Sequence, residues 1–353
     1  MDMKTLKTFQ KERGLTDKTM ETYKTTIQHY EQLNNKTIEE LLKEADTEEE
    51  QRIRWKHRKL RKQLIQYQNW LLTNYNYSTA QTYLSKLKTI YNHYEIEIHS
   101  LPPLNKKQAQ ISKPITYNDL PTKDILRKAY HMSNPLMRSY LLFAISSGCA
   151  KREILNLTRQ DYQEWIKPYS IHEIIKDKVE IIPIIRLKRQ KTNKYYYTFC
   201  SPEAIREIAH YLETRKDDKD YLFKVYPKHL EEKFRILNNQ LGLGTLNNMV
   251  VLRSHTLRKF HASQLHSGEN SLSLDEIDSL QGRSKNMIQQ SYYFDNPEDL
   301  KKKYTRNIDQ VTILDKVHTI TVDSPEVEML KKKPDKIDEL EQLIKKIMEK
   351  NKD

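Results

Sequence analysis

The chain has 353 residues, a length that suits two domains, and its 61 lysine and arginine residues against 48 aspartate and glutamate residues give a formal net charge of +13. That excess makes nucleic acid the expected partner, with an ordinary basic soluble protein as the alternative. Six glycines without a Walker or GxGxxG sequence argue against nucleotide cofactors, and two cysteines, Cys149 and Cys200, argue against a disulfide framework or a zinc site.

The first hundred residues predict a helical domain. Thr16 and Asp17 open a segment with apolar or aromatic residues at helical spacing, namely Met20, Tyr23, Ile27 and Tyr30. A second helix is predicted from Glu48 to Tyr75, and a third from Ser78 to Tyr94 with Ser78 as its cap. We interpret residues 1–100 as a core DNA-binding domain.

The second predicted helix carries a dense basic face. It can be a solvated face, but the density of charge beside aromatic residues favours a surface that follows DNA phosphates. The residues assigned to this surface are Arg52, Arg54, Lys56, Arg58, Lys59 and Lys62.

Residues 101–116 contain three prolines and no helical period, and they predict a flexible or extended linker. A second domain follows over residues 117–310. It has predicted helices at Thr122–Tyr130 and Leu136–Ser146, a β-rich region at Val179–Phe199 with a Lys/Asn turn, and further helices to about Tyr304. The predicted fold class is mainly α with a small antiparallel β-sheet.

Residues 311–353 form a predicted C-terminal tail of one short strand followed by a helix. Ile337, Leu340, Ile344 and Ile347 have coiled-coil-like spacing in that helix. The helix either packs on its own domain or binds a partner helix.

Two sequence motifs point to chemistry on a phosphate. In RSHTLRKFHASQL, His255 and Arg258 are three residues apart near a predicted helix N-terminus, where an anion is favoured. Leu280-Gln281-Gly282-Arg283 follows, and Tyr292 comes nine residues after Arg283. This order resembles the second half of the active site of tyrosine recombinases, and it is most similar to archaeal and archaeal-virus integrases.

The resemblance implies a role for each residue. Tyr292 would be the nucleophile that forms a 3′-phosphotyrosyl enzyme, with the adjacent Tyr293 as its rival. Arg258 would bind a nonbridging phosphate oxygen, and His255 would assist proton transfer or bind the same phosphate. Arg283 would stand where many relatives have His or Trp, as a donor to the phosphate but a poor proton shuttle.

The resemblance also implies a hairpin lysine that protonates the 5′-hydroxyl leaving group. Lys191, in the segment RLKRQKTNKYYYT, matches this lysine, and Lys188 and Lys194 are rivals in the same hairpin. An exposed hairpin lysine that only discourages strand pairing is the alternative.

The first arginine of the family has no clear match. In FAISSGCAKREILNLTRQDY, the bacterial-type position is Ala150 and the archaeal-type position is Lys151, while Arg152 comes one residue later. A shift of one residue rotates a helical side chain by about 100°. Either Arg152 reaches the site from an altered turn, Lys151 acts as a point charge, or the site is impaired.

The function implied is a site-specific DNA recombinase or integrase of a virus or mobile element, which needs neither metal, ATP nor another cofactor. Its implied partners are duplex DNA with an attachment site and other copies of the chain, four in each synapse. A DNA-binding protein with this fold but without the reaction, and a type IB topoisomerase, are the alternatives. No apolar stretch reaches membrane-spanning length and no signal peptide is evident, so a soluble, cytoplasmic protein is expected.

Overall fold

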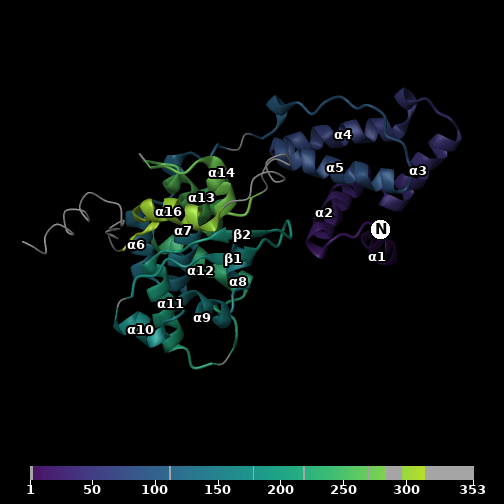
Figure 1. Cartoon of the computed structure of the whole chain (residues 1–353). Helices are drawn as coiled ribbons and strands as arrows, with labels where there is room; N and C mark the ends of the chain where they lie inside the picture. The colour runs from purple at the N-terminus through teal and green to yellow at the C-terminus, as the bar shows by residue number, and fades with distance from the viewer. Residues whose placement is uncertain are drawn as a thin grey trace, which may run out of the picture. The chain divides into compact units, whose positions relative to one another are not determined.

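A computed structural model describes residues 3–110, 113–177, 179–217, 219–268, 270–283 and 296–314. The chain divides into two compact units, Met1–Pro114 and Ile115–Asp353, and each is considered by itself. Figure 1 follows both from the N-terminus onward. Tyr292, Tyr293 and the predicted tail from residue 315 onward lie outside the described residues.

The first unit is helical, as predicted. Its elements are α1 (Met3–Glu12), α2 (Asp17–Asn34), α3 (Ile38–Glu50), the 3-10 helix η1 (Trp55–His57), α4 (Lys59–Asn74), α5 (Tyr77–His93) and η2 (Lys106–Gln108). Thr16 caps α2, as its sequence indicated, by accepting from the backbone N–H of Thr19. Three buried tyrosines at the centre, Tyr30, Tyr67 and Tyr91, make edge-to-face contacts.

The prediction of one continuous helix from Glu48 to Tyr75 is wrong. Helix α3 ends at Glu50, Arg52 has a left-handed φ of 56°, and α4 begins only at Lys59. The buried Glu48 carboxylate accepts the backbone N–H groups of Lys59 at 2.8 Å and Leu60 at 3.4 Å. Glu48 therefore satisfies the start of α4 from another helix, which the local periodicity did not reveal.

The N-cap of α5 differs from the predicted one. Asn76 caps α5 by accepting from the Thr79 backbone N–H, so the prediction of Ser78 as the cap is wrong by two residues. Both residues are good helix caps, and sequence alone did not choose between them.

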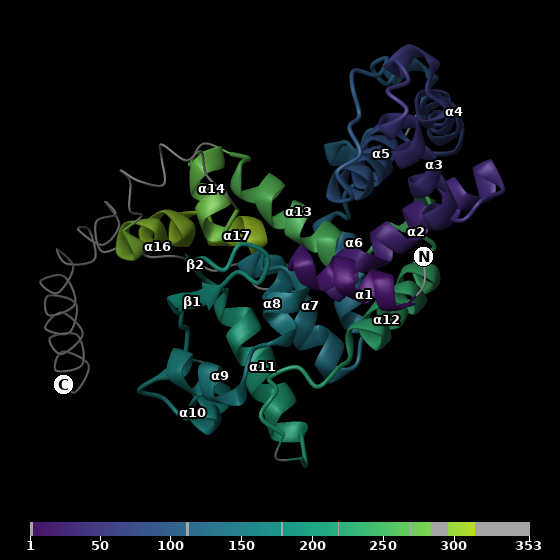
Figure 2. The same cartoon turned by 90° about the vertical axis from the view of Figure 1, so that its right-hand side faces the viewer.

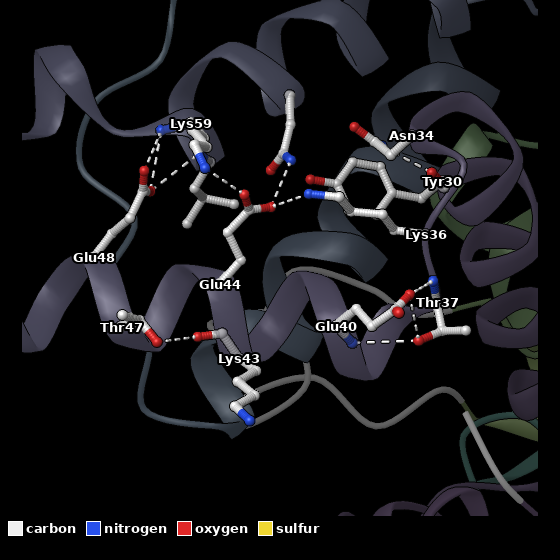
Figure 3. A network of polar contacts seen from close by, with 12 residues as sticks. Tyr30, Asn34, Lys36, Thr37, Glu40, Lys43, Glu44, Thr47, Glu48 and Lys59 are labelled. Atoms are coloured by element: carbon white, nitrogen blue, oxygen red, sulfur yellow. Dashed lines mark hydrogen bonds and ion pairs between the residues drawn. The ribbon is translucent and has the colours of Figure 1, made fainter.

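Figure 3 shows the polar network that joins α3 to its neighbours in the first unit. The Glu44 carboxylate accepts from Lys36 at 2.9 Å, from Lys59 at 2.8 Å and from Gln63 at 3.2 Å. Partial burial by itself would raise the pKa of Glu44, but these hydrogen bonds outweigh it and lower the pKa to about 2. Glu44 therefore stays charged and neutralises nearby lysine charge.

The segment assigned to a linker runs along the first unit as far as Gln110. Trp55 Nε1 donates to the Ser100 carbonyl at 3.1 Å, and Gln68 Nε2 donates to the Pro102 carbonyl at 3.2 Å. Gln110 forms a β-bridge with Asn76. These contacts hold the chain against the helical unit at Ser100, Pro102 and Gln110.

The second unit is built around α7 (Pro135–Ser147), in which ten side chains are buried. Helices α11 (Pro202–Thr214) and α13 (Ser254–Leu265) pack against it (Figure 2). The other helices are η3 (Tyr117–Asp119), α6 (Lys123–His131), α8 (Lys151–Leu155), α9 (Arg159–Ile166), α10 (Ile171–Lys176), α12 (Pro227–Gln240), α14 (Leu274–Leu280), α16 (Pro297–Arg306) and α17 (Ile308–Val311). The predicted helices at 122–130 and 136–146 are confirmed.

Two small antiparallel sheets complete the second unit, in agreement with the predicted fold class. Strand β1 (Ile185–Lys188) pairs with β2 (Tyr195–Thr198), and β3 (Thr245–Leu246) pairs with β4 (Met249–Val250). Residues 179–184 are not a strand, so the β-rich region is shorter than predicted.

The predicted strand from Val311 is wrong where the structure describes it. Val311 is the last residue of α17, and Thr312–Leu314 are not in a strand. The cause is a tertiary contact, because the Glu203 carboxylate accepts the backbone N–H groups of Ile313 and Leu314. The remainder of this stretch lies outside the described residues.

Both cysteines, Cys149 and Cys200, are buried thiols without a disulfide, as expected. None of the helices that the structure describes is long and apolar enough to cross a membrane.

Candidate functional site

Helix α13 places His255 and Arg258 on the same side, one turn apart. His255 lies in the first turn and is exposed, whereas Arg258 is buried, with 6% of its surface accessible. The two residues of the H-x-x-R motif therefore have different surroundings despite their spacing.

The Arg258 guanidinium lies between the ends of two other helices. Its Nη1 donates to the Gly148 carbonyl at 2.7 Å, and its Nη2 donates to the Gln281 carbonyl at 2.5 Å. Gly148 and Gln281 are the C-caps of α7 and α14, where carbonyl groups lack helical partners and favour a cation. Three of the five guanidinium N–H groups remain for another acceptor.

Gln281 and Arg258 donate hydrogen bonds to each other's backbone carbonyl groups. The side-chain Nε2 of Gln281 donates to the Arg258 backbone carbonyl at 2.9 Å and lies 3.0 Å from His261 Nδ1. This reciprocal pairing fixes the Leu280–Arg283 turn on α13. It explains why the two sequence motifs lie together in the structure.

Positive charge gathers around His255. Partial desolvation lowers the pKa of His255, and the nearby charges of Lys259, Arg253, Arg258 and Arg283 lower it further. The imidazole is therefore neutral near pH 7 and able to accept a proton. The structure brings His255, Arg258 and Arg283 near one another, and an anion site at these residues stays a prediction.

Two carboxylates lie beside this cluster, Asp278 next to Arg283 and Glu153 next to Arg258. Glu153 Oε2 is 4.0 Å from Arg258 Nη1, and it accepts from the Tyr196 hydroxyl at 2.8 Å and from the Ala150 backbone N–H at 2.9 Å. Within the described ranges there is no group of three or more His, Cys, Asp and Glu side chains placed to hold a metal ion.

His261 was not predicted, although it lies one turn beyond Arg258. Its ring is fully buried, and a Cβ on Gly148 would approach ring atom Nδ1 to 2.4 Å. Gly148 also has a φ of 62°, so both backbone conformation and close packing require glycine there. Burial and the charges of Arg258 and Arg283 lower the pKa of His261 to about 3.

The predicted lysine hairpin is present. Lys191 lies exposed in its turn, and Lys188 is exposed with its ammonium 5.6 Å from the Tyr195 ring centroid. Lys194 is also exposed. Strand β2 packs against α14, with the Tyr196 ring so close to Gly282 that a Cβ there would approach it to 2.5 Å.

The structure describes the contacts of all three residues in the first-arginine region. Ala150 is the N-cap of α8, and Lys151 forms an ion pair with Glu231 on α12. Arg152 is exposed and forms no hydrogen bond or ion pair with any residue that the structure describes. Among the described residues, neither Lys151 nor Arg152 forms a hydrogen bond or ion pair with His255 or Arg258.

Tyr292 and Tyr293 lie outside the described residues, which stop at Arg283 and resume at Asn296. Arg283 is exposed and forms an ion pair with Asp278 at 3.2 Å. On the other side, Tyr304 of α16 donates to the Ser146 carbonyl at 2.8 Å, which fastens α16 to the end of α7.

The predicted basic surface of the first unit is divided. Four of its cations are exposed, but they lie along the segment between α3 and α4 and in the first turn of α4 instead of on one helix face. They are Arg52, Arg54, Lys56 and Lys62. Arg58 is buried, donates to the Ile53 carbonyl at 2.9 Å and lies 3.3 Å from Glu49. Arg58 holds the loop in place, and the Lys59 ammonium is bound by Glu44.

Comparisons with known proteins place the fold. No protein-family model matches the sequence, and no curated protein matches it. Among solved structures, a lambda integrase (residues 75–356) dimer bound to a COC′ core site has a TM-score of 0.51 at 13% identity, over 84% of this chain and 98% of that chain. XerA recombinase has a TM-score of 0.36 at 17% identity, over 85% and 95%. An integrase from mycobacterium phage Brujita has a TM-score of 0.36 at 13% identity, over 89% and 93%.

The likeness to lambda integrase shows that this chain has the fold of a tyrosine recombinase, mainly helical with a small antiparallel sheet.

Proposed function

We propose that this protein is a site-specific DNA recombinase that cleaves and rejoins strands through a 3′-phosphotyrosine on Tyr292. One observation carries the proposal. A neutral imidazole and two guanidinium groups, His255, Arg258 and Arg283, lie near one another on this fold, and two further cations, Arg253 and Lys259, keep positive charge in excess of the nearby carboxylates Glu153 and Asp278. Such a cluster suits the nonbridging oxygens of a DNA phosphate.

Cleavage follows from the chemistry of these groups. The Tyr292 hydroxyl gives its proton to neutral His255 while its oxygen attacks phosphorus, and the 5′-oxygen leaves with a proton from Lys191. Arg258 is already held by Gly148 and Gln281, so its remaining N–H groups need little reorganisation to bind a phosphate. The products are a 3′-phosphotyrosine and a 5′-hydroxyl, and rejoining reverses the step without ATP.

The first unit would contribute sequence-independent affinity. Arg52, Arg54, Lys56 and Lys62 are exposed cations near one another along the chain, and they suit DNA phosphates. We assign Arg58 and Lys59 to the folded structure instead, because their charges are engaged by Glu49 and Glu44.

The biological setting is part of the proposal. Duplex DNA with an attachment site, four protomers in each synapse and cytoplasmic action are expected for this chemistry. The order of HTLRKF, LQGR and a tyrosine before FDNP favours an integrase of archaeal type from a virus or mobile element.

The proposal is tested by covalent trapping. Duplexes bound from a randomised pool are sequenced, and a nicked duplex of the selected sequence is incubated with wild type, Tyr292→Phe and Tyr293→Phe. We expect a covalent protein–DNA band on a denaturing gel for wild type and Tyr293→Phe, and none for Tyr292→Phe. A band that survives in Tyr292→Phe but not in Tyr293→Phe would move the nucleophile by one residue.

A second function is favoured by the first-arginine region. Lys151 is bound to Glu231 and Arg152 is exposed, so a protein that binds DNA without cutting it also fits this geometry. Binding of the selected duplex with no covalent band, for any variant and on any nicked substrate, would establish that function. Relaxation of plasmids that lack the selected sequence would instead indicate a topoisomerase.

A further inference from the structure

We infer that Arg189 is a positioning residue, which ties the hairpin that carries Lys191 to the turn that carries Arg283. The inference rests on the proposed function for its chemical consequence, although the contact itself does not. No sequence motif singled out Arg189, and the mechanism above does not use it.

The strand register explains where Arg189 points. Side chains of β1 alternate, so Ile185 and Leu187 face the interior while Arg186 and Lys188 are exposed. Arg189 continues the inward series one step beyond Leu187. Its Nη1 donates to the Gly282 carbonyl, next to Arg283.

Arg189 also belongs to the hairpin turn. Its backbone N–H donates to the Lys194 carbonyl at 2.8 Å, and its carbonyl accepts the Asn193 N–H at 2.8 Å. Asn193 takes the left-handed conformation that closes the turn, with a φ of 57°. The link to Gly282 therefore acts two residues from Lys191, inside a closed loop.

A second contact supports the same junction from the base of the hairpin. The Tyr196 ring packs on Gly282, and its hydroxyl donates to Glu153, which lies beside Arg258. Tyr196 fixes the strand, but it is five residues from Lys191. Arg189 is the nearer of the two supports, so it governs the turn itself.

The consequence concerns proton donation to the leaving group. Lys191 is exposed, and among described residues it has no hydrogen bond or ion pair to orient it. Among the described residues, the backbone of the turn is what limits where its ammonium can reach. Loss of the Arg189 link would let the turn move relative to the phosphate site, and misplacement by about 1 Å can cost about 100-fold in rate.

The experiment compares Arg189→Met with Arg186→Met on two nicked duplexes. Arg186 is the matched control, since it is an exposed arginine of the same hairpin, 4.5 Å over the Tyr195 ring. One duplex has the normal 5′-oxygen at the cleaved bond, and the other has a 5′-bridging sulfur, which leaves without protonation. Lys191→Met is run beside them.

We expect Arg189→Met to slow covalent-complex formation on the oxygen duplex by about 10- to 100-fold, less than Lys191→Met, with unchanged DNA affinity. On the sulfur duplex both variants should return to within about threefold of wild type. Arg186→Met should match wild type on both. Arg189→Lys, which keeps a donor, should recover part of the rate.

Two results would overturn the inference: wild-type rates for Arg189→Met on the oxygen duplex, or a defect that persists on the sulfur duplex. Hydrogen exchange of the β1–β2 amides tests the tether without DNA. Exchange that is faster in Arg189→Met than in Arg186→Met supports it, and equal exchange refutes it. If the wild type forms no covalent complex on either duplex, the proposed function fails, and the exchange measurement still decides the role of Arg189.

Discussion

The basic stretch from Arg52 to Lys62 and the cluster around His255 hold similar charges in opposite surroundings. In the first unit, carboxylates approach the buried Arg58 and bind the Lys59 ammonium, while Arg52, Arg54 and Lys56 remain at the surface. In the second unit, the buried Arg258 donates to two backbone carbonyls, and its nearest described carboxylate, Glu153, is 4.0 Å from Nη1. Arg58 also donates to a carbonyl, but Glu49 is closer to it, at 3.3 Å, so more of the charge of Arg258 stays available to an anion.

The largest expected effect tests that buried arginine. Arg258→Met leaves the Gly148 and Gln281 carbonyls without their hydrogen-bond donor, and we expect the free energy of unfolding to fall by about 2–6 kcal/mol, at about 1–3 kcal/mol for each carbonyl. Arg258→Lys should fold better than Arg258→Met but still cleave at least about 100-fold more slowly than wild type, because it lacks the fork. Urea denaturation and single-turnover trapping measure the two effects.

Arg152→Met is the matched control for stability, because Arg152 is exposed and has no partner among the described residues. Its midpoint should equal that of wild type. Equal midpoints for Arg258→Met and Arg152→Met would mean that the carbonyl contacts do not stabilise the fold.

The second-largest expected effect is a loss of stability in acid, caused by His261. Burial and the charges of Arg258 and Arg283 keep this histidine neutral. Its pKa is about 3 in the folded protein and ordinary, near 6.5, in the unfolded chain, so the unfolded state binds the extra proton. Stability should be flat above pH 6.5 and should fall progressively below it, by on the order of 4 kcal/mol at pH 3. Urea denaturation between pH 7.5 and 4.5, with Trp165 fluorescence as the reporter in Trp55→Phe/Trp70→Phe protein, measures the slope.

His261→Gln provides the comparison for that slope. It removes the titrating group and should flatten the pH dependence in this range, whatever its baseline stability. A slope as steep as that of wild type would assign the acid sensitivity to other groups.

A smaller effect is expected at Glu44 in the first unit. The pKa of Glu44 is about 2 in the folded protein, so its contribution is present above about pH 4.5 and is lost as the pH falls toward 2. Glu44→Gln should cost less than about 1 kcal/mol, since solvent screens these ion pairs. It should also steepen the salt dependence of DNA binding, because it releases the charges of Lys36 and Lys59.

Glu40→Gln in the same helix is the control for Glu44→Gln. Glu40 caps α3 through Thr37 and holds neither lysine. An unchanged salt dependence in Glu44→Gln would show that those lysines stay far from DNA.

The smallest expected effect is a difference between Lys59 and Lys62 in how much each contributes to the salt dependence of DNA affinity. Lys62 is exposed, whereas the Lys59 ammonium is already bound by Glu44. Lys62→Ala should reduce the slope of log affinity against log salt by up to about 0.9, the value for one phosphate contact. Lys59→Ala should reduce it less, and fluorescence anisotropy over a salt series compares them. A larger reduction for Lys59→Ala would show that DNA displaces Glu44.

Local signals in the sequence were sufficient for much of the fold. The Thr16 cap, the helices around residues 122–147 and the β1–β2 hairpin each depend on neighbours in the chain. The helix from Glu48 to Tyr75 was mispredicted because a carboxylate eleven residues away from Lys59 satisfies the start of α4. No periodicity contains that information.

The site shows the same limit. The spacing of His255 and Arg258 and the motif at Leu280–Arg283 drew attention to two segments that contact each other in the structure, through Arg258 and the Gln281 carbonyl. The partners of Arg258 and Lys151 come from 110 and 80 residues away, so their contacts could not be foreseen. Arg189 was missed because an arginine in a basic hairpin has no distinctive pattern, and its contact with the Gly282 carbonyl comes from 93 residues away.

The contact between Tyr196 and Gly282 sets how these two positions can vary in engineered forms of this protein. Gly282 needs a left-handed φ of 58° and leaves no room for a Cβ beneath the tyrosine ring. A library that randomises both positions should therefore return small side chains at position 196 whenever position 282 is not glycine. Among non-glycine residues, asparagine should be favoured at position 282, because it tolerates the left-handed conformation. Engineered variants of this protein should therefore exchange residues 196 and 282 together.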